Sequence, residues 1–128
     1  IKYTLRDRDV NAIRLTSLVK YVSDQKINLI VSANITSQRF RDWCRKNVKH
    51  YFEIFIDTPM EVLKRRDYKK LYKNAFNGKI KNVVGVDIKF IKPKKPDLTL
   101  DNSKSKRDLY LNYPKILKEI SKRKIKIF

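Results

Sequence analysis

Both glycines of this 128-residue chain, Gly78 and Gly85, lie in one lysine-rich stretch, residues 71–90. Gly78 follows Asn77, an order typical of a helix that ends in a left-handed residue. Gly85 stands between β-branched residues, where the backbone must turn or let a ligand approach. The sequence therefore predicts a basic flap with a bend at each glycine. The alternative interpretation is a solvated helix and loop with ordinary turn glycines.

Polar residues follow two apolar runs of strand length. The run at 27–35 leads into Thr36, and the run at 51–57 ends in Asp57 and Thr58. Ligands of parallel α/β sheets bind beyond the carboxyl ends of the strands, so these residues are candidates for a ligand site. A Walker A loop needs a glycine, four residues and then Gly-Lys-Ser or Gly-Lys-Thr. Neither glycine of this chain is followed by such a pair, so the phosphate-binding loop is absent from the sequence.

The elements that must position these residues alternate along the chain. Helices are predicted from apolar spacing at about 8–24, 37–47 and 71–76, and at 106–123 in two pieces broken at Pro114. A further helix is predicted to start at Thr58, Pro59 and Glu61, which form a capping box. Strands are predicted at about 27–35, 51–57 and 97–101. The alternation predicts an α/β fold with a doubly wound parallel sheet and helices on both sides.

The net charge of +19, from 32 Lys and Arg against 13 Asp and Glu, limits the partners. Such a positive field attracts nucleic acid or a smaller phosphate-bearing ligand. The lysines are scattered through every segment, however, and no signature of a known nucleic-acid-binding module accompanies them. A basic nucleic-acid-binding module therefore stays as the less favoured alternative.

Length and composition indicate one soluble domain over residues 1–128. No apolar run is long enough to cross a bilayer, so no membrane partner is expected. The single Cys44 cannot form an internal disulfide and is predicted to be a buried structural thiol, which favours the reducing cytoplasm. Because the chain begins at Ile1 without a signal-peptide pattern, we expect a piece of a longer protein.

Four segments resemble one protein family in the same order along the chain. Residues 65–102, which begin RRDYKKLYKNAFNGKIKNVVGVD, are similar to the lid and following segment of adenylylsulfate kinases. YFEIFIDTPMEVLKRRD at 51–67 resembles the family's Val-Asp-Thr-Pro-Leu-Glu-Val strand and helix. YTLRDRDVNAIR at 3–14 resembles its Phe-Ser-x-x-Asp-Arg-x-x-Asn segment, and ANITSQR at 33–39 resembles its Phe-Ile-Ser-Pro-Tyr-Arg.

The resemblance implies a three-layer, P-loop NTPase-like fold that is incomplete here, because the amino-terminal P-loop strand is missing. That strand would lie between 27–35 and 51–57, and the lid would cover about residues 65–95. The activity implied is ATP-dependent phosphoryl transfer to the 3′-hydroxyl of adenylylsulfate, a step of sulfate assimilation. ATP with Mg²⁺ would serve the complete enzyme, the partners would be nucleotide substrates, and a homodimer is left open. With the Walker A portion and the base absent, no catalytic residue is assigned and the fragment alone is expected to be inactive.

Substrate-binding roles carry over only at matching positions. By resemblance, Arg8 and Asn11 would hold the phosphate or sugar of the acceptor, and Lys69 would reach in from the lid. Tyr3 stands where the family has an aromatic side chain that stacks on the base of the acceptor. The substrate-binding residues implied are Tyr3, Arg8, Asn11, Ile35, Thr36, Lys69, Asn82 and Val83. No metal ligand is assigned.

One departure from the family bears on the acceptor. The second base-stacking aromatic of the family is replaced by Val83, so one face of an aromatic sandwich is lost. Weaker purine binding would follow from that loss. A related kinase that acts on another nucleotide-linked acceptor, such as cytidine diphosphoramidate, is therefore kept as the alternative.

Overall fold

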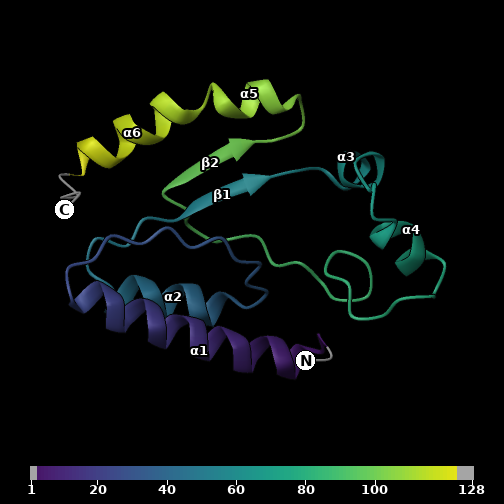
Figure 1. The fold of residues 1–128 in the computed structure, drawn as a ribbon, viewed down its shortest axis with the longest axis horizontal. Coiled ribbons are helices and arrows are strands. Elements are labelled where there is room, and N and C mark those ends of the chain that lie inside the picture. Colours follow the sequence, from purple (N-terminus) through teal and green to yellow (C-terminus); the bar gives the residue numbers. More distant parts are fainter. Residues whose placement is uncertain (1–2, 124–128) are drawn as a thin grey trace.

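The computed structural model describes residues 3–123, and its helices and strands follow in the order α1 (Leu5–Asp24), α2 (Gln38–Asn47), β1 (Ile54–Asp57), α3 (Met60–Arg65), α4 (Leu71–Phe76), β2 (Leu98–Asp101), α5 (Lys106–Tyr110) and α6 (Tyr113–Lys122). Figure 1 shows the two strands between the α1–α2 pair and the α5–α6 pair. The fold is therefore mixed α/β, with helices on both sides of a small sheet.

The two strands pair in parallel, with Ile54 opposite Leu98 and Asp57 opposite Asp101. Parallel pairing of the predicted strands at 51–57 and 97–101 is thus confirmed, although each strand is shorter than expected. The register brings the carboxylates of Asp57 and Asp101 to the same end of the sheet. Leu98 and Leu100 point into the core, where they are buried.

The prediction of a third strand at 27–35 is wrong. Residues 27–37 form no regular element, and the side chains of Ile27, Leu29, Ile30 and Val31 are exposed. A strand exists only where a neighbouring backbone completes its hydrogen bonds. In the described part of the chain, the sheet contains only β1 and β2, so this β-branched run has no strand beside it.

Helix ends follow the local capping chemistry. Helix α1 begins three residues before the predicted start, because the hydroxyl of Thr4 accepts the backbone N–H of Asp7, whose carboxylate binds Thr4 in return. The predicted capping box at Thr58 is wrong. Helix α3 starts at Met60 without a side-chain cap, and the Thr58 hydroxyl instead accepts a hydrogen bond from Asn102. The predicted break near Pro114 is confirmed, since α5 and α6 are separate helices.

A buried ionic cluster joins α2 to the amino ends of both strands. Glu53 lies 3.6 Å from Arg41 and 3.0 Å from Arg45, which also bonds Asp97 on the segment before β2. Burial alone would raise the pKa of Asp97, but hydrogen bonds from Arg45, from the backbone of Glu53 and from Arg123 together hold it below its usual value. Nearby, Cys44 is buried as predicted, and burial and then the charge of Glu53 raise the pKa of its thiol.

The chain keeps an unusually large surface. It exposes 10082 Å², whereas a compact monomer of this length exposes about 7,200 Å². The excess is partly apolar, since Ile54 and Ile56 of β1 are exposed as well as the run at 27–35. None of the helices among residues 3–123 has the length and hydrophobicity that a bilayer crossing requires.

The two glycines offer a matched pair for testing backbone strain. Both have positive φ, +71° at Gly78 and +89° at Gly85. A Cβ on Gly78 would meet no atom within 4 Å, but a Cβ on Gly85 would lie 2.6 Å from Cε of Met60. We expect Gly78→Ala to lower the free energy of unfolding by about 1 kcal/mol from the left-handed backbone alone. Gly85→Ala should lower the free energy of unfolding by more, because of the added contact with Met60. Combining Gly85→Ala with Met60→Ala should recover only the part of the loss that exceeds that of Gly78→Ala.

Urea unfolding of Gly78→Ala, Gly85→Ala, Met60→Ala and the double variant Gly85→Ala/Met60→Ala measures these losses. An equal cost at both glycines would show that the Met60 side chain moves away freely, and that the contact between the loop at 82–88 and α3 contributes nothing.

Candidate functional site

Arg8 connects the start of α1 to a loop far along the chain. Its Nε donates to the carbonyl oxygen of Tyr3 (3.0 Å), and its Nη2 donates to the carbonyl oxygen of Asn82 (2.9 Å). The guanidinium carbon lies 5.9 Å from the centre of the Tyr3 ring. In Figure 1, the amino end of α1 lies beside the loop between α4 and β2. Three residues predicted to bind substrate are therefore brought together.

The loop that carries Asn82 is a tight turn over residues 82–88. The backbone N–H of Gly85 donates to the carbonyl of Ile88 (2.7 Å), and that of Ile88 donates to the carbonyl of Val83 (3.2 Å). Val83 is 6% exposed, whereas Tyr3 is 64% exposed. Within this group, Tyr3 is therefore the aromatic surface that a base can reach.

Asp87 closes the turn with its carboxylate. One oxygen accepts the backbone N–H of Asn82 and the other accepts that of Val83, both at 2.6 Å. The bond from Asn82, then the bond from Val83, hold the pKa of Asp87 below its usual value. Asp87 was not among the predicted site residues. The available signal was its place two residues after a turn glycine, where an Asp side chain often binds nearby backbone amides.

The other predicted residues lie on several elements. Asn11 is exposed on α1, one turn after Arg8. Ile35 and Thr36 precede α2; the carbonyl of Ile35 accepts a bond from Arg41 (2.6 Å), and Thr36 is buried. Lys69 is exposed in the turn between α3 and α4, with its ammonium 5.7 Å from the centre of the Tyr68 ring. The contact of Ile35 is with Arg41 and that of Lys69 is with Tyr68, so these contacts do not connect either residue to Arg8.

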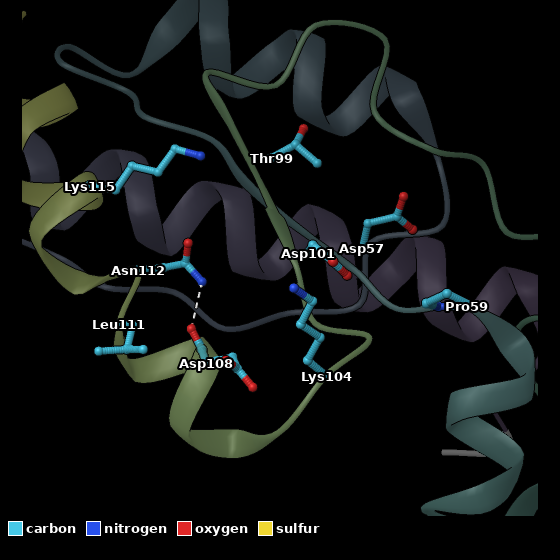
Figure 2. A pocket seen from close by; sticks show the side chains of 9 residues that line it. All are labelled: Asp57, Pro59, Thr99, Asp101, Lys104, Asp108, Leu111, Asn112 and Lys115. Carbon is cyan, nitrogen blue, oxygen red and sulfur yellow. Dashed lines mark hydrogen bonds between the residues drawn. The ribbon is translucent and has the colours of Figure 1, made fainter.

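An open hollow of about 500 Å³ lies at the carboxyl ends of β1 and β2. Figure 2 shows Asp57 and Asp101 from the strands, Lys104 from the following loop, and Lys115 from α6 around it. A ligand site at this edge agrees with the general position of ligands in parallel α/β sheets. The two lysines supply positive charge, while Asp57 is already paired with Lys92 at 2.8 Å.

Arg66 ties the base of the predicted lid to the loop after β2. Its Nη1 donates to the backbone carbonyl of Asn102 (2.9 Å), and Nη2 donates to the carbonyl of Lys104. The amino-terminal end of the segment at 65–95 is thereby anchored beside the hollow.

The residues present do not fit a resident Mg²⁺ or the phosphates of ATP by themselves. Across residues 3–123, no group of three or more His, Cys, Asp or Glu side chains is arranged to hold a metal ion. The backbone-amide loop that cradles ATP phosphates is also absent from the sequence.

Comparison with protein families matches residues 1–101 to the family described as adenylylsulphate kinase. The chain is 40% identical over 101 residues to cytidine diphosphoramidate kinase of Campylobacter jejuni, covering 79% of this chain and 59% of that protein. It is 33% identical over 109 residues to adenylyl-sulfate kinase of Pseudomonas aeruginosa, covering 84% of this chain and 56% of that protein. The chain thus spans little more than half the length of these curated relatives.

A solved structure also matches this fold. The APS kinase of Mycobacterium tuberculosis, in complex with AMPPNP and APS, aligns with a TM-score of 0.75 at 30% identity. The alignment covers 90% of this chain and 69% of that one.

Proposed function

Because this chain belongs to the adenylylsulfate kinase family, we propose that it contributes the acceptor-binding part of an enzyme that transfers a phosphoryl group from ATP to the ribose 3′-hydroxyl of adenylylsulfate. The observation that carries the proposal is the contact of Arg8 with Asn82, which joins two positions, 74 residues apart, that are predicted to bind the acceptor. In this role the protein acts in the cytoplasm, in sulfate assimilation.

Each acceptor residue has a defined task in this proposal. The exposed ring of Tyr3 stacks on the base of the acceptor. Arg8 grips a phosphate, for which a guanidinium offers a planar pair of donors. Asn11, one turn along α1, binds the sugar, and Lys69 approaches from the lid when residues 65–95 close over the nucleotides and exclude water. Ile35 and Thr36 line the site next to α2.

ATP requires more than this chain provides. A backbone-amide loop holds the β- and γ-phosphates in P-loop kinases, and Mg²⁺ neutralises the developing negative charge when it is bound with ATP. The described residues supply neither the loop nor a metal-ligand set. Lys104 and Lys115 line the hollow beyond β1 and β2 together with Asp57, Asp101 and Asp108, so the hollow carries charges of both signs.

Cytidine diphosphoramidate is a second candidate acceptor. Two observations favour it: Val83 is a buried aliphatic residue in the place of the family's second stacking aromatic, and the Campylobacter jejuni relative carries that acceptor in its name. A pyrimidine has less ring surface than a purine, so the loss of one stacking face should weaken its binding less.

Removal of the Tyr3 ring tests the site and the acceptor together. Base stacking on an aromatic side chain contributes roughly 1–3 kcal/mol, so we expect Tyr3→Ala to weaken acceptor binding by about tenfold to a hundredfold. Isothermal titration calorimetry with adenylylsulfate and with cytidine diphosphoramidate measures the effect, and the tighter ligand identifies the acceptor.

Tyr21→Ala is the matched control, because Tyr21 is an exposed tyrosine of α1 outside the Arg8 group. Equal losses in both variants, or no binding of either nucleotide to the unaltered protein, would contradict the proposed acceptor site.

A further inference from the structure

We propose that Asp87 is a positioning residue for the acceptor site: its carboxylate holds the backbone of Asn82 and Val83, this fixes the Asn82 carbonyl against Arg8, and the orientation of Arg8 sets the affinity for the acceptor's phosphate. The inference rests on the proposed function for its ligand. Its geometric part, the control of Arg8 by Asp87, can be measured without any ligand.

Asp87 first acts on the backbone of Asn82, whose N–H donates to its carboxylate. The φ of Asn82 is +65°, in the left-handed region that non-glycine residues rarely adopt. In this conformation the backbone N–H groups of Asn82 and Val83 both donate to one carboxylate, and such charge-assisted bonds can offset part of the strain. Without the Asp87 carboxylate, Asn82 loses one of the bonds that hold its backbone, and we expect its carbonyl to turn away from Arg8 more readily.

The Asn82 carbonyl in turn acts on the guanidinium of Arg8, which donates to it. One carbonyl on each side, Tyr3 at Nε and Asn82 at Nη2, fixes the plane of the group. A guanidinium has five N–H donors, so it can hold both carbonyls and still bind a phosphate. Because the fork is rigid and planar, its direction decides whether a phosphate is bound by two parallel bonds or by one. In this proposal, Asp87 acts on the ligand through Arg8.

The sign of the expected effect separates this role from simple charge. Replacing an aspartate by asparagine makes the protein more positive, which by itself favours binding of a phosphate-bearing ligand. If Asp87 positions Arg8, Asp87→Asn should nevertheless weaken binding, because an NH₂ group replaces one of the two carboxylate oxygens and cannot accept the backbone N–H that is bonded there. We expect a loss of roughly tenfold, the size of one charge-assisted hydrogen bond.

Asp42→Asn provides the matched control. Asp42 is an exposed aspartate of α2, and its carboxylate accepts a hydrogen bond from Gln38 rather than from the 82–88 turn. The two variants have the same net charge, so Asp42→Asn should bind the acceptor as tightly as the unaltered protein or slightly more tightly.

A double-mutant cycle with Arg8→Lys tests whether Asp87 acts through Arg8. A lysine keeps the positive charge but cannot hold both carbonyls in one plane. Calorimetric titration of adenylylsulfate and cytidine diphosphoramidate should therefore show that Asp87→Asn changes affinity by less than twofold when residue 8 is lysine. Additive losses would mean that Asp87 only stabilises the fold, and would overturn the proposal.

Proton exchange at the Nη2 hydrogens of Arg8, which donate to the Asn82 carbonyl, gives a second readout when it is followed by NMR in the absence of nucleotide. Exchange should be slow in the unaltered protein and in Asp42→Asn, and faster in Asp87→Asn. If neither nucleotide binds but exchange responds in this way, the proposed function fails and the control of Arg8 by Asp87 stands. If a nucleotide binds and neither affinity nor exchange responds to Asp87→Asn, the positioning role fails and the proposed function stands.

Discussion

Joining this chain to an amino-terminal segment that contains a strand and a Walker A loop is expected to produce ATP-dependent phosphoryl transfer, whereas the 128-residue chain alone should give no turnover above the uncatalysed background. The physical reason is that the β- and γ-phosphates need backbone amides and a lysine around them, and no glycine of this chain belongs to such a loop. The rates of phosphoryl transfer by the joined protein and by the 128-residue chain should therefore differ by the whole catalytic effect, which is many orders of magnitude.

The added strand has a place to bind. Among the described residues, one edge of β1 pairs with no strand. Ile54 and Ile56 of β1 are exposed, and the run at 27–35 exposes Ile30 completely. A parallel strand between β1 and this run would complete the backbone hydrogen bonds of both segments. Hydrogen exchange should accordingly slow at 27–35 and at β1 in the joined protein.

The measurement is 3′-phosphorylation of adenylylsulfate or of cytidine diphosphoramidate, with labelled ATP. A joined protein whose Walker A lysine is replaced by alanine serves as the control and should be inactive while keeping the slow exchange. Turnover by the 128-residue chain alone would refute the requirement for the loop. If hydrogen exchange at 27–35 did not change, the added strand would not pair with this segment.

Arg41→Met is expected to give the largest loss of stability from a single substitution. Arg41 is buried beside Glu53, and it also donates to the carbonyls of Ile35 (2.6 Å) and Ile91 (2.8 Å). The variant keeps the volume but leaves a buried carboxylate and two carbonyls without this partner. Breaking one side of a buried ion pair costs about 3–5 kcal/mol, which we expect as the drop in the free energy of unfolding.

Arg39→Met is the matched control two residues away on the same helix. Arg39 is mostly exposed and pairs with Asp9 of α1 at 2.8 Å. An exposed pair of this kind contributes about 0–1 kcal/mol. Urea denaturation of both variants measures the two losses. Similar small losses would mean that Arg45 alone neutralises Glu53, and that Arg41 does not hold the segments at 35 and 91 to α2.

Local features of the fold were predictable from the sequence. The helix at 71–76 ends at Asn77 and Gly78 as expected, and the division between α5 and α6 falls just before Pro114. These features depend on bonds between residues a few positions apart, so their signals lie in short stretches of sequence. The family was also predictable, because residues 3–102 carry its motifs in order.

Tertiary structure decided the features that depend on distant partners. The run at 27–35 has the composition of a buried strand, yet it forms none, because a strand needs a neighbour that these residues cannot supply themselves. Likewise, no local pattern places Arg8 beside Asn82 or gives Asp87 its part in that contact. From the sequence, through its resemblance to the family, Arg8 and Asn82 could be predicted to belong to one site. Only the folded backbone, with its left-handed turn at Asn82, brings the two into hydrogen-bond distance.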